Sequence, residues 1–174
     1  RGRVKYAVVS VGSMAFYKCK TLESIVIPDH IKSIGTNAFS ECSALTSVSL
    51  PKTITYLNSS LFSNCTALRT FTIPDNITSI YGSVFESCSS LSEINIPSSV
   101  TSIGKYAFRY CNSLKSITIP NSVKSIYRGA FYKCKALTDI TLPDSLTTVS
   151  QEMFYECTAL ESITIPIGVT HIEH

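Results

Sequence analysis

The chain has 174 residues, of which 44% are hydrophobic and only 16% are charged, so Ser and Thr supply much of the polar surface. This length suits one folded unit, and the net charge of +3 is too small to indicate nucleic-acid binding, which needs a strong basic excess. No apolar run approaches the roughly 20 residues that span a bilayer, so we expect no membrane insertion within these residues.

The sequence repeats itself every 23 residues. Cysteines stand at this spacing from Cys19 to Cys157, prolines from Pro28 to Pro166, and phenylalanines from Phe16 to Phe154. Such a period is typical of a solenoid, in which each unit buries its apolar face against its neighbours. We therefore expect a single domain, residues 1–174, with a partial first unit (1–18), six repeats and a partial last unit (157–174). The predicted repeats are 19–41, 42–64, 65–87, 88–110, 111–133 and 134–156.

Each unit predicts its elements in the same chain order. After the cysteine comes an alternating segment such as Ile117–Thr118–Ile119, which predicts a short strand, and Pro120 ends it because proline has no N–H to donate. Strands of successive units are expected to pair into a continuous parallel sheet. The segment from Ala107 to Cys111 has helical spacing but is too short for a helix, so it predicts a helical or 3₁₀ turn. The expected fold is a right-handed coil with one short parallel β-strand and one such turn per unit.

The pattern resembles the BspA-like branch of the leucine-rich repeats over essentially the whole chain. The elements that carry the resemblance are the segments Leu91 to Pro97, Ser102 to Gly104 and Ala107 to Cys111. Known members of that family are surface proteins of oral bacteria and parasitic protists, implicated in adhesion. The resemblance implies a binding scaffold, and it nominates no catalytic residue because such repeat families share none.

The seven cysteines are expected to be buried free thiols. No two are closer than 23 residues, whereas zinc sites need clustered ligands, so we expect no metal or other cofactor. Stacking would align their Cβ vectors in parallel, which does not suit disulfides. Free thiols are typical of a reducing compartment, while the resemblance implies the cell surface. The sequence predicts a cell-surface or secreted protein, with a cytoplasmic protein as the alternative.

The histidines do not indicate an enzyme. They occur at His30, His171 and His174, and none recurs with a carboxylate and a nucleophile as a catalytic triad requires. We therefore expect a non-enzymatic protein.

One candidate binding surface is the outward face of the predicted strands. If the apolar residues of a strand point inward, the alternating polar ones point outward, and solenoids commonly bind ligands on such an extended face. The alternative is that these hydroxyls only keep the sheet soluble. The candidate ligand-binding residues of this face are Ser47, Ser49, Thr70, Thr72, Glu93, Asn95, Ser116, Thr118, Asp139 and Thr141.

A second candidate surface comes from the order of charges. The segment between Ile94 and Thr138 contains seven Lys and Arg residues and no Asp or Glu. Several of these bases stand near tyrosines around the predicted turn. Arg and Tyr are enriched at interfaces, and a basic field attracts anionic partners such as acidic proteins or sulfated glycans. The alternative is that the tyrosines cover seams between coils. The candidate residues of this basic side are Lys105, Tyr106, Arg109, Tyr110, Arg128, Tyr132, Lys133 and Lys135.

These observations predict a module that binds a protein or a glycan, most simply part of a cell-surface adhesion protein that contacts host or matrix molecules. An intracellular scaffold that holds a protein partner is the alternative function.

Overall fold

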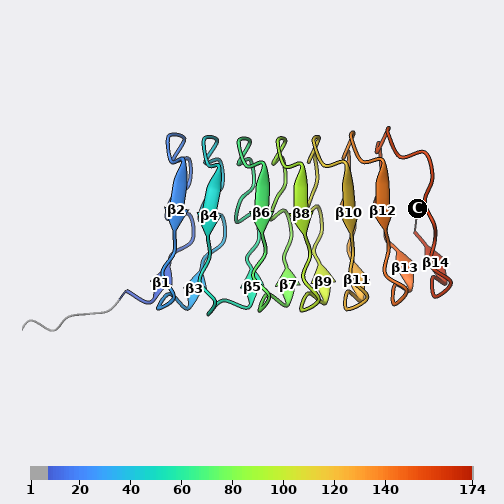
Figure 1. The fold of residues 1–174 in the computed structure, drawn as a ribbon, viewed down its shortest axis with the longest axis horizontal. Helices are drawn as coiled ribbons and strands as arrows, with labels where there is room; N and C mark the ends of the chain where they lie inside the picture. Colours follow the sequence, from blue (N-terminus) through green and yellow to red (C-terminus); the bar gives the residue numbers. More distant parts are fainter. Residues whose placement is uncertain (1–7, 174) are drawn as a thin grey trace, which may run out of the picture.

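A computed structural model describes residues 8–173 of the chain as a stack of parallel coils (Figure 1). Each coil between β2 and β13 contributes a three-residue strand and a two-residue strand. The three-residue strands are β2 (Ser24–Val26), β4 (Ser47–Ser49), β6 (Thr70–Thr72), β8 (Glu93–Asn95), β10 (Ser116–Thr118) and β12 (Asp139–Thr141). The two-residue strands are β1 (Ser10–Val11), β3 (Ser33–Ile34), β5 (Tyr56–Leu57), β7 (Ser79–Ile80), β9 (Ser102–Ile103), β11 (Ser125–Ile126), β13 (Thr148–Val149) and β14 (His171–Ile172).

The strand register confirms the 23-residue coil. In β10 and β12, Ser116 pairs with Asp139 and Ile117 pairs with Ile140, so each residue lies beside its own counterpart in the next coil. The two-residue strands were not expected, because two residues are too few to give an alternating pattern. Residues 1–7 of the predicted first unit and residue 174 lie outside the described part of the chain.

The predicted continuous sheet is divided instead into short pieces. The three-residue strands pair only as β2–β4, β6–β8 and β10–β12, and the two-residue strands form a central sheet β5-β7-β9-β11 with β1–β3 and β13–β14 at its sides. The three-residue strands and the two-residue strands are interrupted between different pairs of coils. Two neighbouring coils whose strands of one kind do not pair are therefore still joined by their strands of the other kind. At the β3/β5 and β11/β13 interruptions, side chains replace backbone donors: Asn58 Nδ2 donates to the Ile34 carbonyl at 2.7 Å, and the Ser150 hydroxyl donates to the Ile126 carbonyl at 2.6 Å.

A third set of backbone hydrogen bonds between coils, or ladder, runs through the stacked segments that correspond to Ala107 to Cys111. We call the stacked segments 14–19, 37–42, 60–65, 83–88, 106–111, 129–134 and 152–157 the turn column. The Phe108 N–H donates to the Ala130 carbonyl of the next coil at 2.8 Å, and the equivalent bond recurs at each coil boundary from Phe16 to Phe131. The turn column is thus the one ladder that is uninterrupted within the described residues.

The predicted helical or 3₁₀ turn is wrong for the described residues. Tyr106 and Tyr110 have φ angles of 57° and 60°, and equivalent positions of the other coils are also left-handed. A right-handed helix cannot contain such residues. Amide groups alternate instead: Tyr106, Phe108 and Tyr110 bond to the next coil, while the amides between them bond three residues back within the turn.

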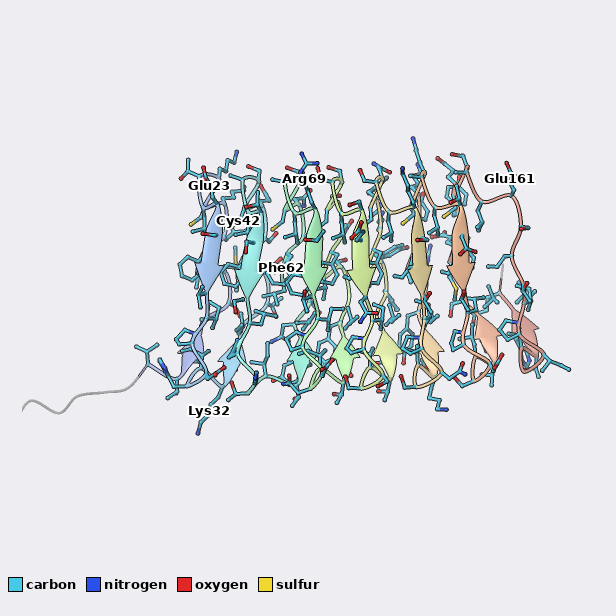
Figure 2. The ribbon with its side chains drawn as sticks, in the orientation of Figure 1. Glu23, Lys32, Cys42, Phe62, Arg69 and Glu161 are labelled. Atoms are coloured by element: carbon cyan, nitrogen blue, oxygen red, sulfur yellow. The ribbon has the colours of Figure 1, made fainter. Side chains whose placement is uncertain are left out.

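The turn column also holds the centre of the core. Phe85, Phe108 and Phe131 are fully buried and stack with ring centroids 5.5 Å apart. Figure 2 shows Phe62 and Cys42 inside the coils. Each thiol from Cys42 onward donates to a phenylalanine carbonyl of the preceding coil, as Cys111 Sγ does to Phe85 at 3.2 Å.

The cysteines are free, and all except the exposed Cys19 are buried, which confirms the expectation for six of the seven. Burial raises the pKa of the Cys88 thiol to about 12 and that of the Cys157 thiol to about 11. These thiols stay protonated at neutral pH and behave as small apolar side chains that also donate a weak hydrogen bond.

Candidate binding surfaces

The ten candidate residues of the sheet face are all exposed, because the central residue of each three-residue strand turns inward and its two neighbours turn outward. Six of them line one shallow hollow of about 390 Å³, which we call the sheet-face hollow. They are Thr70, Thr72, Glu93, Asn95, Ser116 and Thr118.

The floor of the sheet-face hollow is apolar and lies across an interruption of the sheet. Phe71, Ile94 and Ile117 line it from below, and no backbone hydrogen bond joins β8 to β10 in the described residues. Glu93 is the one charged residue of its lining. The hollow therefore offers a carboxylate among hydroxyl and amide groups over an apolar base, which suits a ligand with hydrogen-bond donors or a positive charge.

The other candidates of this face lie apart from that hollow. Asp139 and Thr141 line a neighbouring hollow of about 300 Å³, and Asp144, Ser162 and Thr164 line it with them. Ser47 and Ser49 of β4 are exposed and line neither hollow.

The candidate residues of the basic side form a cluster of aromatic rings and ion pairs across several coils. The Arg109 guanidinium lies 4.7 Å from the ring centroid of Tyr110 and 5.1 Å from those of Tyr106 and Tyr132, and it pairs with Glu86 at 3.1 Å. The Tyr132 ring also lies under the Lys133 ammonium, at 5.4 Å.

Glutamates of flanking coils neutralise much of this predicted basic side. Arg128 forms two hydrogen bonds to Glu152, at 2.8 and 3.2 Å, and Lys133 pairs with Glu156 at 3.2 Å. The Arg128 hydrogen bonds hold the pKa of the Glu152 carboxyl below its usual value. The acid-free stretch of sequence is thus not an acid-free surface, because residues one coil away lie beside it.

Two bases of the basic side remain outside this network. Neither Lys105 nor Lys135 forms an ion pair with a described carboxylate. The glutamates Glu86, Glu152 and Glu156 were missed by reading charge along the sequence, although their offsets of 23 or 24 residues from their partners match the coil period.

A third hollow, which the sequence did not indicate, opens between β11 and β13. It has a volume of about 400 Å³, and we call it the edge hollow. Its charged lining residues are Lys105, Lys124, Arg128 and Glu173.

The described residues contain no helix that is long and apolar enough to cross a membrane. In residues 8–173, His, Cys, Asp and Glu side chains do not gather in groups of three or more that could hold a metal ion.

Fold and surface together define a leucine-rich repeat solenoid. The sequence matches the family described as the BspA type leucine rich repeat region, in six copies, over residues 9–109 and 78–174. The chain belongs to this family, as the sequence pattern predicted.

Solved structures of bacterial leucine-rich repeat proteins have the same fold. The leucine-rich repeat protein of T. pallidum is 30% identical, with a TM-score of 0.67 over 95% of this chain and 67% of its own. A leucine-rich cell surface protein of Faecalibacterium prausnitzii is also 30% identical, with a TM-score of 0.61 over 94% of this chain and 53% of its own. The pneumococcal vaccine antigen PcpA shares the fold at 20% identity, with a TM-score of 0.61 over 94% of this chain and 50% of its own. No curated protein matches the sequence.

The family and its solved relatives support a repeat module that binds protein. Repeat families of this kind are generally non-enzymatic scaffolds, and no catalytic family is indicated for this chain.

Proposed function

We propose that this chain is the binding domain of a cell-surface or secreted adhesion protein and that it holds a protein ligand over the sheet-face hollow. The observation that carries the proposal is the convergence of six outward strand residues on one hollow with an apolar floor. Interfaces combine a desolvated apolar centre with a polar rim in this way.

The chemistry of the hollow favours a ligand segment that brings a cation or several N–H donors. Glu93 pairs with Thr70 in the strand register, and Ser116 of the following coil lines the same hollow, so the Glu93 carboxylate has hydroxyl groups in the coils on both sides. Since no base lines the hollow, a lysine or arginine of the ligand is the natural partner for Glu93.

The buried thiols remove an objection to an extracellular location. Six of the seven cysteines are buried, and desolvation raises the pKa of thiols such as Cys88, so these groups are poor substrates for oxidation. These six buried thiols are therefore compatible with an oxidising environment. A relative of similar fold and 30% identity is a cell surface protein, which is consistent with this location.

Binding of the chain to an array of immobilised matrix proteins tests the proposal. Glu93→Lys is expected to weaken protein binding roughly tenfold or more, because it places a cation where the ligand supplies one. Ser49→Lys is the matched control, since Ser49 is also exposed at an outward strand position but belongs to the separate β2–β4 pair and lies outside the hollow.

Equal loss of binding in both variants would indicate a general charge effect rather than a site. If Glu93→Lys leaves every interaction intact, the proposed site is wrong. Binding that depends instead on charge reversal of Arg109, Arg128 and Lys133 would move the function to the basic side.

A further inference from the structure

The edge hollow combines features that the sheet-face hollow lacks. Three basic side chains line it, Lys105, Lys124 and Arg128, against the single carboxylate of Glu173. Arg128 is engaged by Glu152, but neither Lys105 nor Lys124 forms an ion pair with a described carboxylate. Both lysines are exposed at the rim. The hollow thus holds two ammonium groups that are free to bind an anion.

The interrupted ladder adds backbone donors to these charges. Where the two-residue strands are paired, the amide of the residue just before the strand donates to the preceding coil. Lys124 N–H donates in this way to the Thr101 carbonyl at 2.9 Å, and Thr170 N–H to the Thr147 carbonyl at 2.9 Å. The Thr147 amide makes no such bond to β11 in the described structure, and neither does the Ser150 amide. Both residues line the edge hollow.

Ser150 explains why its own amide is released. Its hydroxyl donates to the Ile126 carbonyl at 2.6 Å and so takes the acceptor that the equivalent backbone amide uses in other coils, where Tyr127 N–H bonds to Ile103. Unpaired amides beside ammonium groups are the elements of an oxyanion site, because each adds a positive partial charge or a hydrogen-bond donor.

We propose that the edge hollow binds a sulfate or phosphate oxyanion through Lys105, Lys124 and the amides of Thr147 and Ser150. The exposed ring of Tyr127 borders the same hollow and can pack against the group that carries the oxyanion. This site is separate from the sheet-face hollow and does not rest on the function proposed for it. It shares Lys105 and the lining residue Arg128 with the predicted basic side, but it does not include Arg109 and Lys133, which glutamates neutralise.

The molecule contains its own control for this inference. The pairing of the two-residue strands is interrupted in the same way between β3 and β5. There Lys32, labelled in Figure 2, occupies the coil position of Lys124. There Ser13 stands in the position of Lys105 and Thr36 in that of Arg128. An interruption with one lysine and no second base is not expected to hold an oxyanion.

Amide chemical shifts of the chain under titration test the site, with inorganic sulfate in one arm and a sulfated oligosaccharide in the other. We expect the Thr147 and Ser150 resonances to move, and the Lys105→Ala/Lys124→Ala variant to bind roughly tenfold more weakly or worse. Lys32→Ala is expected to bind as the parent does. Glu173→Gln is expected to strengthen binding, because it removes the one opposing charge of the lining.

The two arms separate the sources of the oxyanion. Shifts in both arms would support a site for the free anion, whereas shifts with the oligosaccharide alone would support a sulfate ester recognised with its sugar. Unmoved Thr147 and Ser150 resonances in both arms would overturn the proposal. So would equal weakening by Lys32→Ala, since that result indicates only general attraction between charges. Glu93→Lys serves as a reference variant. Even if it fails to bind protein, the anion should still move its Thr147 and Ser150 resonances, because the two hollows are separate.

Discussion

The turn column and the sheet face are built from the same 23-residue unit but are held together differently. In the turn column, backbone bonds cross each coil boundary and the phenylalanine rings stack at 5.2–5.8 Å from Phe16 to Phe154. On the sheet face, the described strands pair two by two and leave gaps between the pairs. The column therefore holds the stack together, and the face has more freedom to differ from coil to coil.

This difference separates stability from binding. The inward-facing Phe and Cys positions of the turn column are the same in each coil. The outward positions of the strands vary from Ser to Glu to Asp, and both the sheet-face hollow and the edge hollow lie across interruptions of a strand ladder. A solenoid of this kind can change its ligand contacts without changing the contacts that stack its coils.

Removal of a ring from the turn column is expected to have the largest effect on stability. Phe108→Ala deletes a fully buried ring between two stacked neighbours and should lower the free energy of unfolding by about 3–5 kcal/mol, measured by urea denaturation. Ile94→Ala, at the half-buried floor of the sheet-face hollow, should cost clearly less. Equal losses would mean that the column has no special role.

Alkaline pH should weaken the turn column through its thiols. Burial raises the pKa of Cys88 from 9.0 to about 12, so the folded thiol stays protonated where the unfolded one ionises. Its stabilising contribution is fully present below about pH 9 and is lost as pH rises toward about 12, by up to about 1.4 kcal/mol per pH unit. Urea midpoints measured across this range test the slope.

Cys88→Ala is the control for that measurement. It lacks the titrating thiol, so its stability should fall less steeply with pH than that of the parent chain. A parallel pH dependence in both proteins would assign the alkaline loss to other groups. Thiol labelling of the folded chain at about pH 8 should modify Cys19 alone, because it is the one exposed cysteine of the described residues.

Loss of Arg109 should have an intermediate effect. Arg109→Ala removes contacts with three tyrosine rings and the ion pair to Glu86, and we expect a loss of about 1–2 kcal/mol in urea denaturation. Lys135→Ala, an exposed base without an ion pair to a described carboxylate, should change stability by less than about 0.5 kcal/mol. A double-mutant cycle with Glu86→Ala separates the ion pair from the ring contacts. If Arg109→Ala leaves the free energy of unfolding unchanged, the cluster does not stabilise the fold and is free to serve binding alone.

The period of the sequence predicted the solenoid and the outward strand residues, because inward and outward positions follow directly from alternation. It did not predict the turn geometry. The left-handed positions are occupied by residues as different as Met14, Asn37 and Tyr106, so no residue type marks them. The conformation is imposed by bonds to the neighbouring coil, which a reading of one unit at a time does not contain.

The charge of the basic side was misjudged for a related reason. Charge was read along the chain, whereas the nearest neighbours of Arg128 and Lys133 on the surface lie about one coil away, at Glu152 and Glu156. In a solenoid, electrostatic neighbours recur at the period of the repeat rather than at adjacent positions. The edge hollow was missed because an interrupted ladder leaves no trace in hydrophobic periodicity.

The smallest expected effects distinguish the two kinds of interruption. Ser150→Ala removes the hydroxyl that bonds to the Ile126 carbonyl at the β11/β13 interruption, and it should cost about 1 kcal/mol, since a partly buried hydrogen bond is lost. Ser116→Ala, on the exposed edge of the β8/β10 interruption, should change stability by less than about 0.5 kcal/mol. Urea denaturation of the two variants measures both values. If Ser116→Ala proves as costly as Ser150→Ala, the sheet face takes part in holding the coils together, and the division between a structural column and a variable binding face does not hold.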